Sequence, residues 1–246
     1  MKISMAAVGA MMLAVGTGYA GTVQNALTAE EKAAGWQLLW DGTTTKGWAG
    51  VKEKCKAFPK KGWTVEKEAD GNVLTVNRKR KSGGGDIVTV KKYRDFDFRF
   101  EFRLTPGSNS GVKYFFDETK NRGTCEEYQI LHEKHPDWNL GKGGNRRVAS
   151  LYDLKAANAE KIVKAPGEWN CGRVVSKGKH VEHWLNGQKV LEYERGSEAF
   201  RKMVQASKYA KWGTGGRHWG ELEEGRIQLQ DHQDTVSFRN LKIKEL

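Results

Sequence analysis

The most constraining feature of this chain is a run in which apolar and charged residues alternate. In segment 96–104, FDFRFEFRL, Phe or Leu occupies every second position and charged residues fill the positions between. Side chains of a β-strand point alternately to its two faces, so the segment predicts an antiparallel strand with one buried and one solvated face. A face carrying four phenylalanines needs a second layer to cover it, which favours a two-sheet sandwich.

Other segments repeat the strand signal. Segment 62–77 has two alternating runs around Asp70-Gly71, the pattern of a hairpin. Segment 167–194 predicts three strands, with turns at Lys177-Gly178 and Asn186-Gly187. Twelve or more such strands, joined by short turns, predict an all-β, two-sheet antiparallel jelly-roll sandwich.

Helical signals are few. Thr28 followed by Glu31 has the spacing of a capping box and predicts a short helix near the start. The polar segment 197–220 predicts a second short helix followed by a loop.

The first twenty residues have the pattern of a secretory signal peptide. Lys2 precedes an apolar run that ends near Val15, and Gly18 and Ala20 form a plausible cleavage site. The run is shorter than the ~20 apolar residues that span a bilayer, although a retained anchor remains the alternative. We therefore expect a secreted or periplasmic bacterial protein with no membrane span after cleavage, and a single domain over 21–246.

The charge of the chain is strongly positive, with a formal net value of +12. Much of the excess lies in two runs, 51–62 and 77–86, whose Gly and Ser content is typical of solvated loops. No nucleic-acid-binding motif accompanies them, so we expect no nucleic-acid partner; an acidic glycan or cell surface is favoured over one.

Three cysteines, Cys55, Cys125 and Cys171, are present. An oxidising compartment would allow one disulfide, in any of three pairings, with one thiol left over.

Three segments carry an unusual polar face in a chain so rich in Lys elsewhere. If they belong to one sheet, its outer face combines carboxylates and amides, which pair with vicinal hydroxyls, with an aromatic platform for a sugar ring. The alternative is an ordinary solvated sheet face. The residues are Glu127 and Gln129; Glu182 and Trp184; and Gln228, Gln230 and His232.

Seven segments, in order along the chain, resemble the 3-keto-disaccharide hydrolase domain family, which is common in secreted bacterial proteins. They are GWQLLWDGTTTKGW, NSGVKYFF, EEYQIL, ASLYDL, GEWNCGRVV, VEHWLNGQKV and GRIQLQDHQDTVSFRNLKIKEL. The resemblance implies a concanavalin-like jelly roll and a carbohydrate substrate, a glycoside whose sugar is oxidised to a ketone at carbon 3.

Such a ketone acidifies the C2 hydrogen and places the C1 substituent where it can be eliminated. The reaction needs a base, an acid for the departing oxygen, and a cradle for the enolate. A conventional retaining glycosidase instead needs two carboxylates about 5–5.5 Å apart. The residue two positions after Glu127 is the amide Gln129, which disfavours that mechanism. A non-catalytic, lectin-like module using the same face remains the alternative.

The candidate residues follow from this chemistry. Glu127 and His232 are the expected acid and base, since an unperturbed histidine titrates near neutrality. Lys113 and Arg239 are expected to hold the enolate oxygen. The substrate-binding candidates are Asn109, Ser110, Gln129, Tyr152, Glu182, Trp184, Gln230 and Asp231.

One segment departs from the family pattern. Many relatives have an acid after EYQIL, where this chain has His132; Glu133 and Asp137 are the candidates to substitute for the acid. His132, His135 and Asp137 offer metal-ligand chemistry at irregular spacing, so the sequence requires no cofactor and leaves a divalent metal open.

Overall fold

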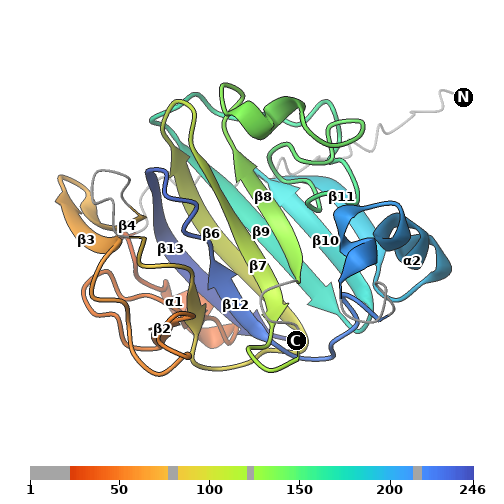
Figure 1. Ribbon diagram of the computed structural model, residues 1–246. Coiled ribbons are helices and arrows are strands. Elements are labelled where there is room, and N and C mark those ends of the chain that lie inside the picture. Colours follow the sequence, from red (N-terminus) through yellow and green to blue (C-terminus); the bar gives the residue numbers. More distant parts are fainter. Residues whose placement is uncertain (1–22, 77–82, 121–124, 213–217) are drawn as a thin grey trace, which may run out of the picture.

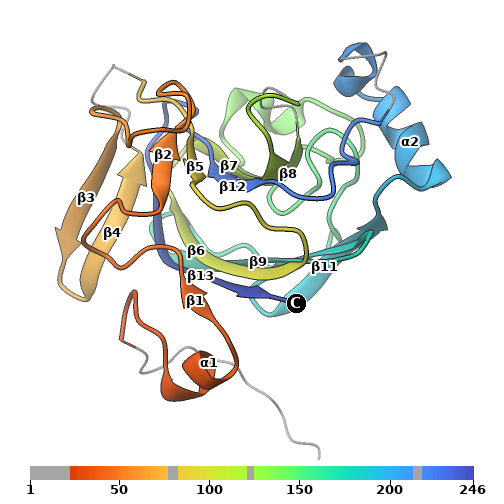
Figure 2. The same cartoon turned by 90° about the horizontal axis from the view of Figure 1, so that it is seen from below.

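Two antiparallel sheets stack face to face in the computed structural model, which describes residues 23–76, 83–120, 125–212 and 218–246 (Figure 1). The larger sheet has the order β11-β10-β9-β6-β13-β4-β3, with β1 paired to β13, and the smaller has the order β2-β5-β12-β7-β8. Figure 2 shows the two layers edge-on, with α1 outside the larger sheet. The predicted signal peptide 1–20 lies outside the described residues. The strands are β1 (Gln37–Leu38), β2 (Trp48–Gly50), β3 (Trp63–Glu68), β4 (Gly71–Val76), β5 (Ile87–Thr89), β6 (Phe96–Leu104), β7 (Asn109–Phe116), β8 (Glu126–Leu131), β9 (Trp169–Lys177), β10 (His180–Leu185), β11 (Gln188–Glu194), β12 (Arg226–Leu229) and β13 (Val236–Glu245); the helices are α1 (Ala29–Ala33), α2 (Glu198–Gln205) and the 3₁₀ turns η2 (Pro136–Asn139) and η3 (Lys208–Lys211).

The alternating segment forms β6 with the bounds expected from the sequence, and its apolar residues are all buried between the sheets. Phe100 stacks on Phe98 at 5.1 Å between ring centroids and meets Tyr128 of the smaller sheet edge-on at 5.2 Å. Each such side chain contributes about 1.5–3 kcal/mol by burial. The predicted jelly-roll sandwich is confirmed.

The predicted turns and helices are also present. Asn186 and Gly187 have φ of 49° and 85°, the two positive values that a tight type I′ hairpin between β10 and β11 requires. The hydroxyl of Thr28 accepts the N–H of Glu31, whose carboxylate accepts the N–H of Thr28, which completes the capping box of α1. The second helix is α2, capped by Ser197.

The long excursion between β8 and β9 returns along the free edge of β8. Ala149 N–H donates to the Gln129 carbonyl at 2.8 Å, and Tyr152 N–H donates to the Glu127 carbonyl at 3.0 Å. Lys208 N–H then donates to the Asp153 carboxylate at 2.9 Å, which ties η3 to the same excursion. Two segments remote in sequence are thereby brought beside Glu127.

The three cysteines are free thiols, so the disulfide allowed by the sequence is not formed. Cys55 and Cys125 pack in one small apolar cluster with Val88 and Phe116, and Cys171 lies on β9. Within the described ranges, no helix is long and apolar enough to cross a membrane.

Candidate functional site

A row of polar side chains crosses the outer face of the smaller sheet. Gln228 of β12 pairs with Lys113 of β7, which pairs with Glu127 of β8. Their sequence neighbours Ile227 and Val112 are in the core, so strand alternation points these three side chains outward. With ~4.8 Å between strands, the polar row of Gln228, Lys113 and Glu127 spans ~10 Å.

Lys113 lies between two carboxylates. Its Nζ is 3.8 Å from Oδ2 of Asp86 and 4.0 Å from Oε2 of Glu127. Burial opposes the charge, but the carboxylates of Glu127 and Asp86 prevail and raise the pKa of Lys113 above its ordinary value. Asp86 also accepts the Gln228 amide and, at 2.8 Å, the Asp231 N–H. Lys113 is therefore a fixed cation, and Asp86 is an acceptor already in use.

Glu127 is 5% exposed, and the charged groups that act on it are Lys113, Lys208, Asp86 and His232. Burial raises the pKa of Glu127, against the opposing charges of Lys113 and Lys208. Its carboxylate lies over Gly111: a Cβ at that residue would be 2.3 Å from Oε1. A carboxylate with a raised pKa is a stronger base, and the absence of a side chain at residue 111 gives it room.

Tyr152 stands beside Glu127, with two cations near its ring. Lys208 Nζ is 4.2 Å from the ring centroid, and the Arg146 guanidinium carbon is 5.3 Å from it. Arg146 is itself paired with Asp153 at 2.7 Å. Burial raises the pKa of Tyr152 to about 12, so its hydroxyl keeps its proton at neutral pH and can donate a hydrogen bond.

Two histidines and an aspartate gather near Asn109, where β7 begins, four residues along that strand from Lys113. The exposed His232 lies 5.9 Å from His135, ring to ring, and His135 Nε2 is 3.6 Å from Oδ2 of Asp234. Ligand atoms of the three lie within 4.8 Å of one another, as a metal site requires. Asn109 donates its N–H to the same Asp234 carboxylate at 3.1 Å and has a buried side-chain oxygen without a hydrogen-bond partner.

The protonation of His135 does not favour a metal in this arrangement. Its Nδ1 accepts the Asp137 N–H at 3.0 Å, so the proton of the neutral ring is on Nε2, toward Asp234. The predicted ligand His132 is used elsewhere, because its Nδ1 accepts the Lys134 N–H at 3.0 Å. In the described part of the chain, His132, His135 and Asp137 do not form the trio expected from the sequence.

Several predicted residues do converge on this face. Gln129 is next to Glu127 on the outer face of β8, but it is 1% exposed and its Oε1 accepts the Ile130 N–H at 3.2 Å. Gln230 donates its N–H to the Gly111 carbonyl at 2.9 Å and has a buried side-chain oxygen without a partner. Asp231 accepts the Gly85 N–H at 2.9 Å and holds the loop.

Four predicted site residues do not join the polar row. Glu182 and Trp184 lie on β10, in the larger sheet, where the Trp184 indole donates to Glu182 at 2.8 Å. Arg239 lies on β13 of that sheet, paired with Glu101 at 2.6 Å. Ser110 alternates into the core and donates its hydroxyl to the Gln230 carbonyl at 2.8 Å. The expectation that all three polar strands share one sheet therefore holds for β8 and β12 but not for β10.

A model of the 3-keto-alpha-glucoside-1,2-lyase-like domain matches residues 35–244. The chain belongs to this family. It is 33% identical over 237 residues to a 3-keto-disaccharide hydrolase from Bacteroides thetaiotaomicron, covering 87% of this chain and 79% of that protein.

Two solved structures from Parabacteroides distasonis ATCC 8503, both provisionally described as glycosyl hydrolases, have the same fold. One is 32% identical with a TM-score of 0.75, covering 91% of this chain and 99% of the other. The second is 25% identical with a TM-score of 0.57, covering 81% and 99%.

The sequence did not predict three charged residues that lie near the polar row or Tyr152, namely Asp86, Lys208 and Arg146. Asp86 directly precedes the short apolar strand β5. A carboxylate at the start of a strand was the available sequence signal for its contact with Lys113. Lys208 and Arg146 have no local signal, because each reaches Tyr152 through an excursion whose path depends on tertiary contacts.

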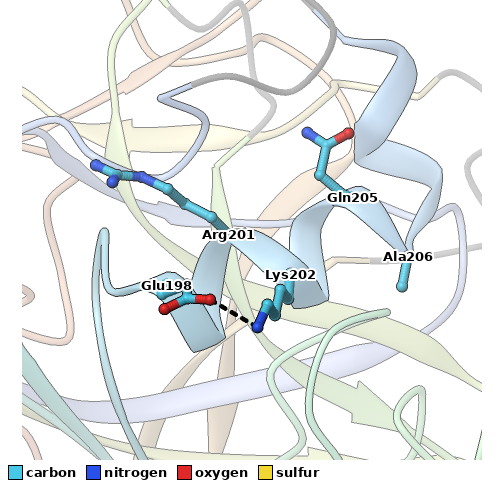
Figure 3. A pocket seen from close by; sticks show the side chains of 5 residues that line it. All are labelled: Glu198, Arg201, Lys202, Gln205 and Ala206. Atoms are coloured by element: carbon cyan, nitrogen blue, oxygen red, sulfur yellow. Dashed lines mark ion pairs between the residues drawn. The ribbon is translucent and has the colours of Figure 1, made fainter.

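Two hollows lie on the surface of the described residues. One, of about 250 Å³, adjoins the polar row and is lined in part by Lys52, Asp86 and Asp231. The other lies on the exposed side of α2, where Glu198 and Lys202 form an ion pair at 2.7 Å (Figure 3). Only the first offers chemistry that continues the polar row.

Proposed function

We propose that this protein cleaves glycosides whose sugar carries a ketone at C3, by removing the C2 proton and expelling the C1 substituent. Family membership and the 3-keto-disaccharide hydrolase relative support a carbohydrate-active enzyme of the glycoside hydrolase type. The observation that carries the mechanism is Glu127, a buried carboxylate with a raised pKa beside a fixed cation and a protonated phenol.

Glu127 is the base of the proposed reaction. The alternative carboxylate, Asp86, already accepts hydrogen bonds from Gln228 and Asp231. Removal of the C2 proton places the electron pair in a C2–C3 double bond and the negative charge on the C3 oxygen. Return of that charge restores the ketone, forms a C1–C2 double bond and breaks the bond from C1 to the departing oxygen.

The departing oxygen then needs a proton. His232 is exposed in the loop after β12 and close enough for its charge to act on Glu127, and we assign it this role. Tyr152 offers its hydroxyl to a sugar hydroxyl. Addition of water across C1–C2 afterwards gives net hydrolysis.

The test compares a 3-keto-disaccharide with its unoxidised parent. We expect cleavage of the oxidised sugar alone, an enol-sugar intermediate, and deuterium at C2 of the product when the reaction runs in D₂O. Glu127→Gln is expected to bind the substrate and to lose about 10²–10⁴ in kcat. Binding without cleavage by the wild-type protein would indicate a lectin-like module, and equal cleavage of the unoxidised sugar would contradict the proposal.

The N-terminal signal pattern supports a place for this reaction outside the cytoplasm. Fractionation of bacteria that express the full chain tests this, and a protein confined to the cytoplasm would contradict it.

A further inference from the structure

Two lysines act electrostatically on Glu127, and their surroundings differ. Lys113 is buried between Asp86 and Glu127, which neutralise it. Lys208 is exposed, and among the described residues its ammonium makes no ion pair with a carboxylate; it lies 4.2 Å from the centroid of the Tyr152 ring and 5.2 Å from that of Tyr209. The ammonium of Lys208 is thus not paired with a carboxylate of the described residues.

The backbone of Lys208 is nevertheless fixed. Its N–H donates to Asp153 at 2.9 Å, and the hydroxyl of Ser207 accepts the Tyr209 N–H at 3.0 Å. Asp153 directly follows Tyr152, whose N–H donates to the Glu127 carbonyl. Two successive hydrogen bonds therefore link the start of η3 to β8, and the side chain of Lys208 extends over Tyr152.

We propose that Lys208 is a further catalytic residue, whose ammonium binds the C3 ketone oxygen of the substrate and holds the negative charge of the enolate. This inference rests on the proposed function. The enolate oxygen needs a cation that is not held in an ion pair with a carboxylate, and among the described residues Lys208 meets that condition where Lys113 does not. No covalent bond to Lys208 forms: the electron pair from the C2–H bond passes to the C3 oxygen and returns when the C1 bond breaks.

The protonation of Lys208 is consistent with this role. Although the side chain as a whole is exposed, its ammonium is desolvated beside the rings of Tyr152 and Tyr209, and this lowers the pKa of Lys208 against the opposing charges of Glu127 and Asp153. A lysine with a lowered pKa is a stronger hydrogen-bond donor, and an oxyanion is the acceptor that benefits most.

The test replaces Lys208 in the full protein and measures kcat and KM separately on a 3-keto-disaccharide. We expect Lys208→Met to lower kcat about 10²–10³-fold and to raise KM by about tenfold, because the ammonium already binds the ketone oxygen and the enolate charge develops only after binding. Lys208→Arg keeps a cation and is expected to recover part of the loss, as is ethylamine added to Lys208→Met. Lys211→Met, on the same 3₁₀ turn and exposed, is the matched control and keeps wild-type kinetics.

A second measurement separates this inference from the proposed function. In the Glu127→Gln background, calorimetry compares the affinity for the 3-keto sugar with that for its unoxidised parent. We expect the preference for the ketone to fall about tenfold on adding Lys208→Met, whatever the turnover of the wild type. Three results would each overturn the electrostatic role: an unchanged preference for the ketone, a wild-type kcat in Lys208→Met, or an adduct on Lys208 trapped by borohydride. A wild-type protein that binds the ketone through Lys208 but does not cleave the sugar would contradict only the proposed function.

Discussion

Replacing Gly111 by alanine tests whether the position of Glu127 determines activity. The added Cβ would be 2.3 Å from Oε1 of Glu127 and 3.0 Å from its Cγ and Cδ. Ordinary contact begins near 3.4 Å, so the carboxylate has to move by about 1 Å. A displacement of this size at a reacting group costs about 10²-fold in rate, or about 2.7 kcal/mol of transition-state stabilisation.

The fold should tolerate the same change. The φ of Gly111 lies outside the left-handed region, so alanine adopts the backbone without strain. The displaced group is the end of a flexible side chain, and a glycine inside a strand is itself unfavourable by about 0.5–1 kcal/mol relative to alanine. We expect a melting temperature close to that of the wild type and a kcat/KM about 10²-fold lower.

A double-mutant cycle identifies the cause. If the alanine acts through the carboxylate, then Gly111→Ala lowers kcat/KM in the wild type but hardly at all in the Glu127→Gln background. Equal effects in both backgrounds, or full activity in Gly111→Ala, would refute the assignment of Glu127 as the base. Steady-state kinetics on the 3-keto sugar and thermal melting of all four proteins supply the measurements.

Four further predictions follow from the structure. Burial raises the pKa of Glu127 above 4.5, so the ionisation of Glu127 lowers the free energy of unfolding as pH rises through the raised value. The melting temperature of Glu127→Gln should therefore exceed that of the wild type near pH 8, and this difference should vanish near pH 4. Burial lowers the pKa of His183 from 6.5 to about 4, so its neutral form contributes stability above pH 6.5 that is lost toward pH 4, up to about 3 kcal/mol, and urea titrations should show a weaker loss in His183→Gln. Arg239→Ala should lose about 2 kcal/mol of stability, because it removes the ion pair to Glu101. Both Arg239→Ala and Trp184→Ala should keep kcat/KM within about twofold of the wild type, and a larger kinetic loss would contradict a site on the smaller sheet alone. Because His135 Nδ1 accepts an amide N–H, dialysis against a chelator should leave kcat unchanged, and restoration of lost activity by added Mn²⁺ or Zn²⁺ would show the opposite.

The sequence predicted those parts of the fold that local patterns determine. The alternation of β6, the Asn186-Gly187 turn and the capping box of α1 each depend on residues within a few positions of one another. The jelly-roll class followed from many such signals together. The partner of the buried His183 was not predicted, because Tyr114, whose hydroxyl lies 2.7 Å from His183 Nε2, is remote from it in sequence.

The site was predicted in part, for a related reason. Alternation tells which face of a strand is polar but not which sheet the strand joins, so β10 looked equivalent to β8 and β12 in the sequence. Glu127 was found because β8 carries an unusual polar face, and His232 because it continues the alternation of β12, although that strand ends at Leu229. Asp86 and Lys208 were missed because their approach depends on loops whose course no local pattern specifies.

The placement of β12 and β13 has a consequence for biosynthesis. β12 lies between β5 and β7, and β13 between β6 and β4, so residues 226–245 supply an interior strand to each layer. A ribosome delivers these residues after all the other described strands, and until then each half-built layer presents unpaired strand edges to other chains. Vectorial synthesis therefore cannot complete either layer on its own: both layers keep unpaired edges, and the nascent chain needs protection from aggregation, until residues 226–245 have been made.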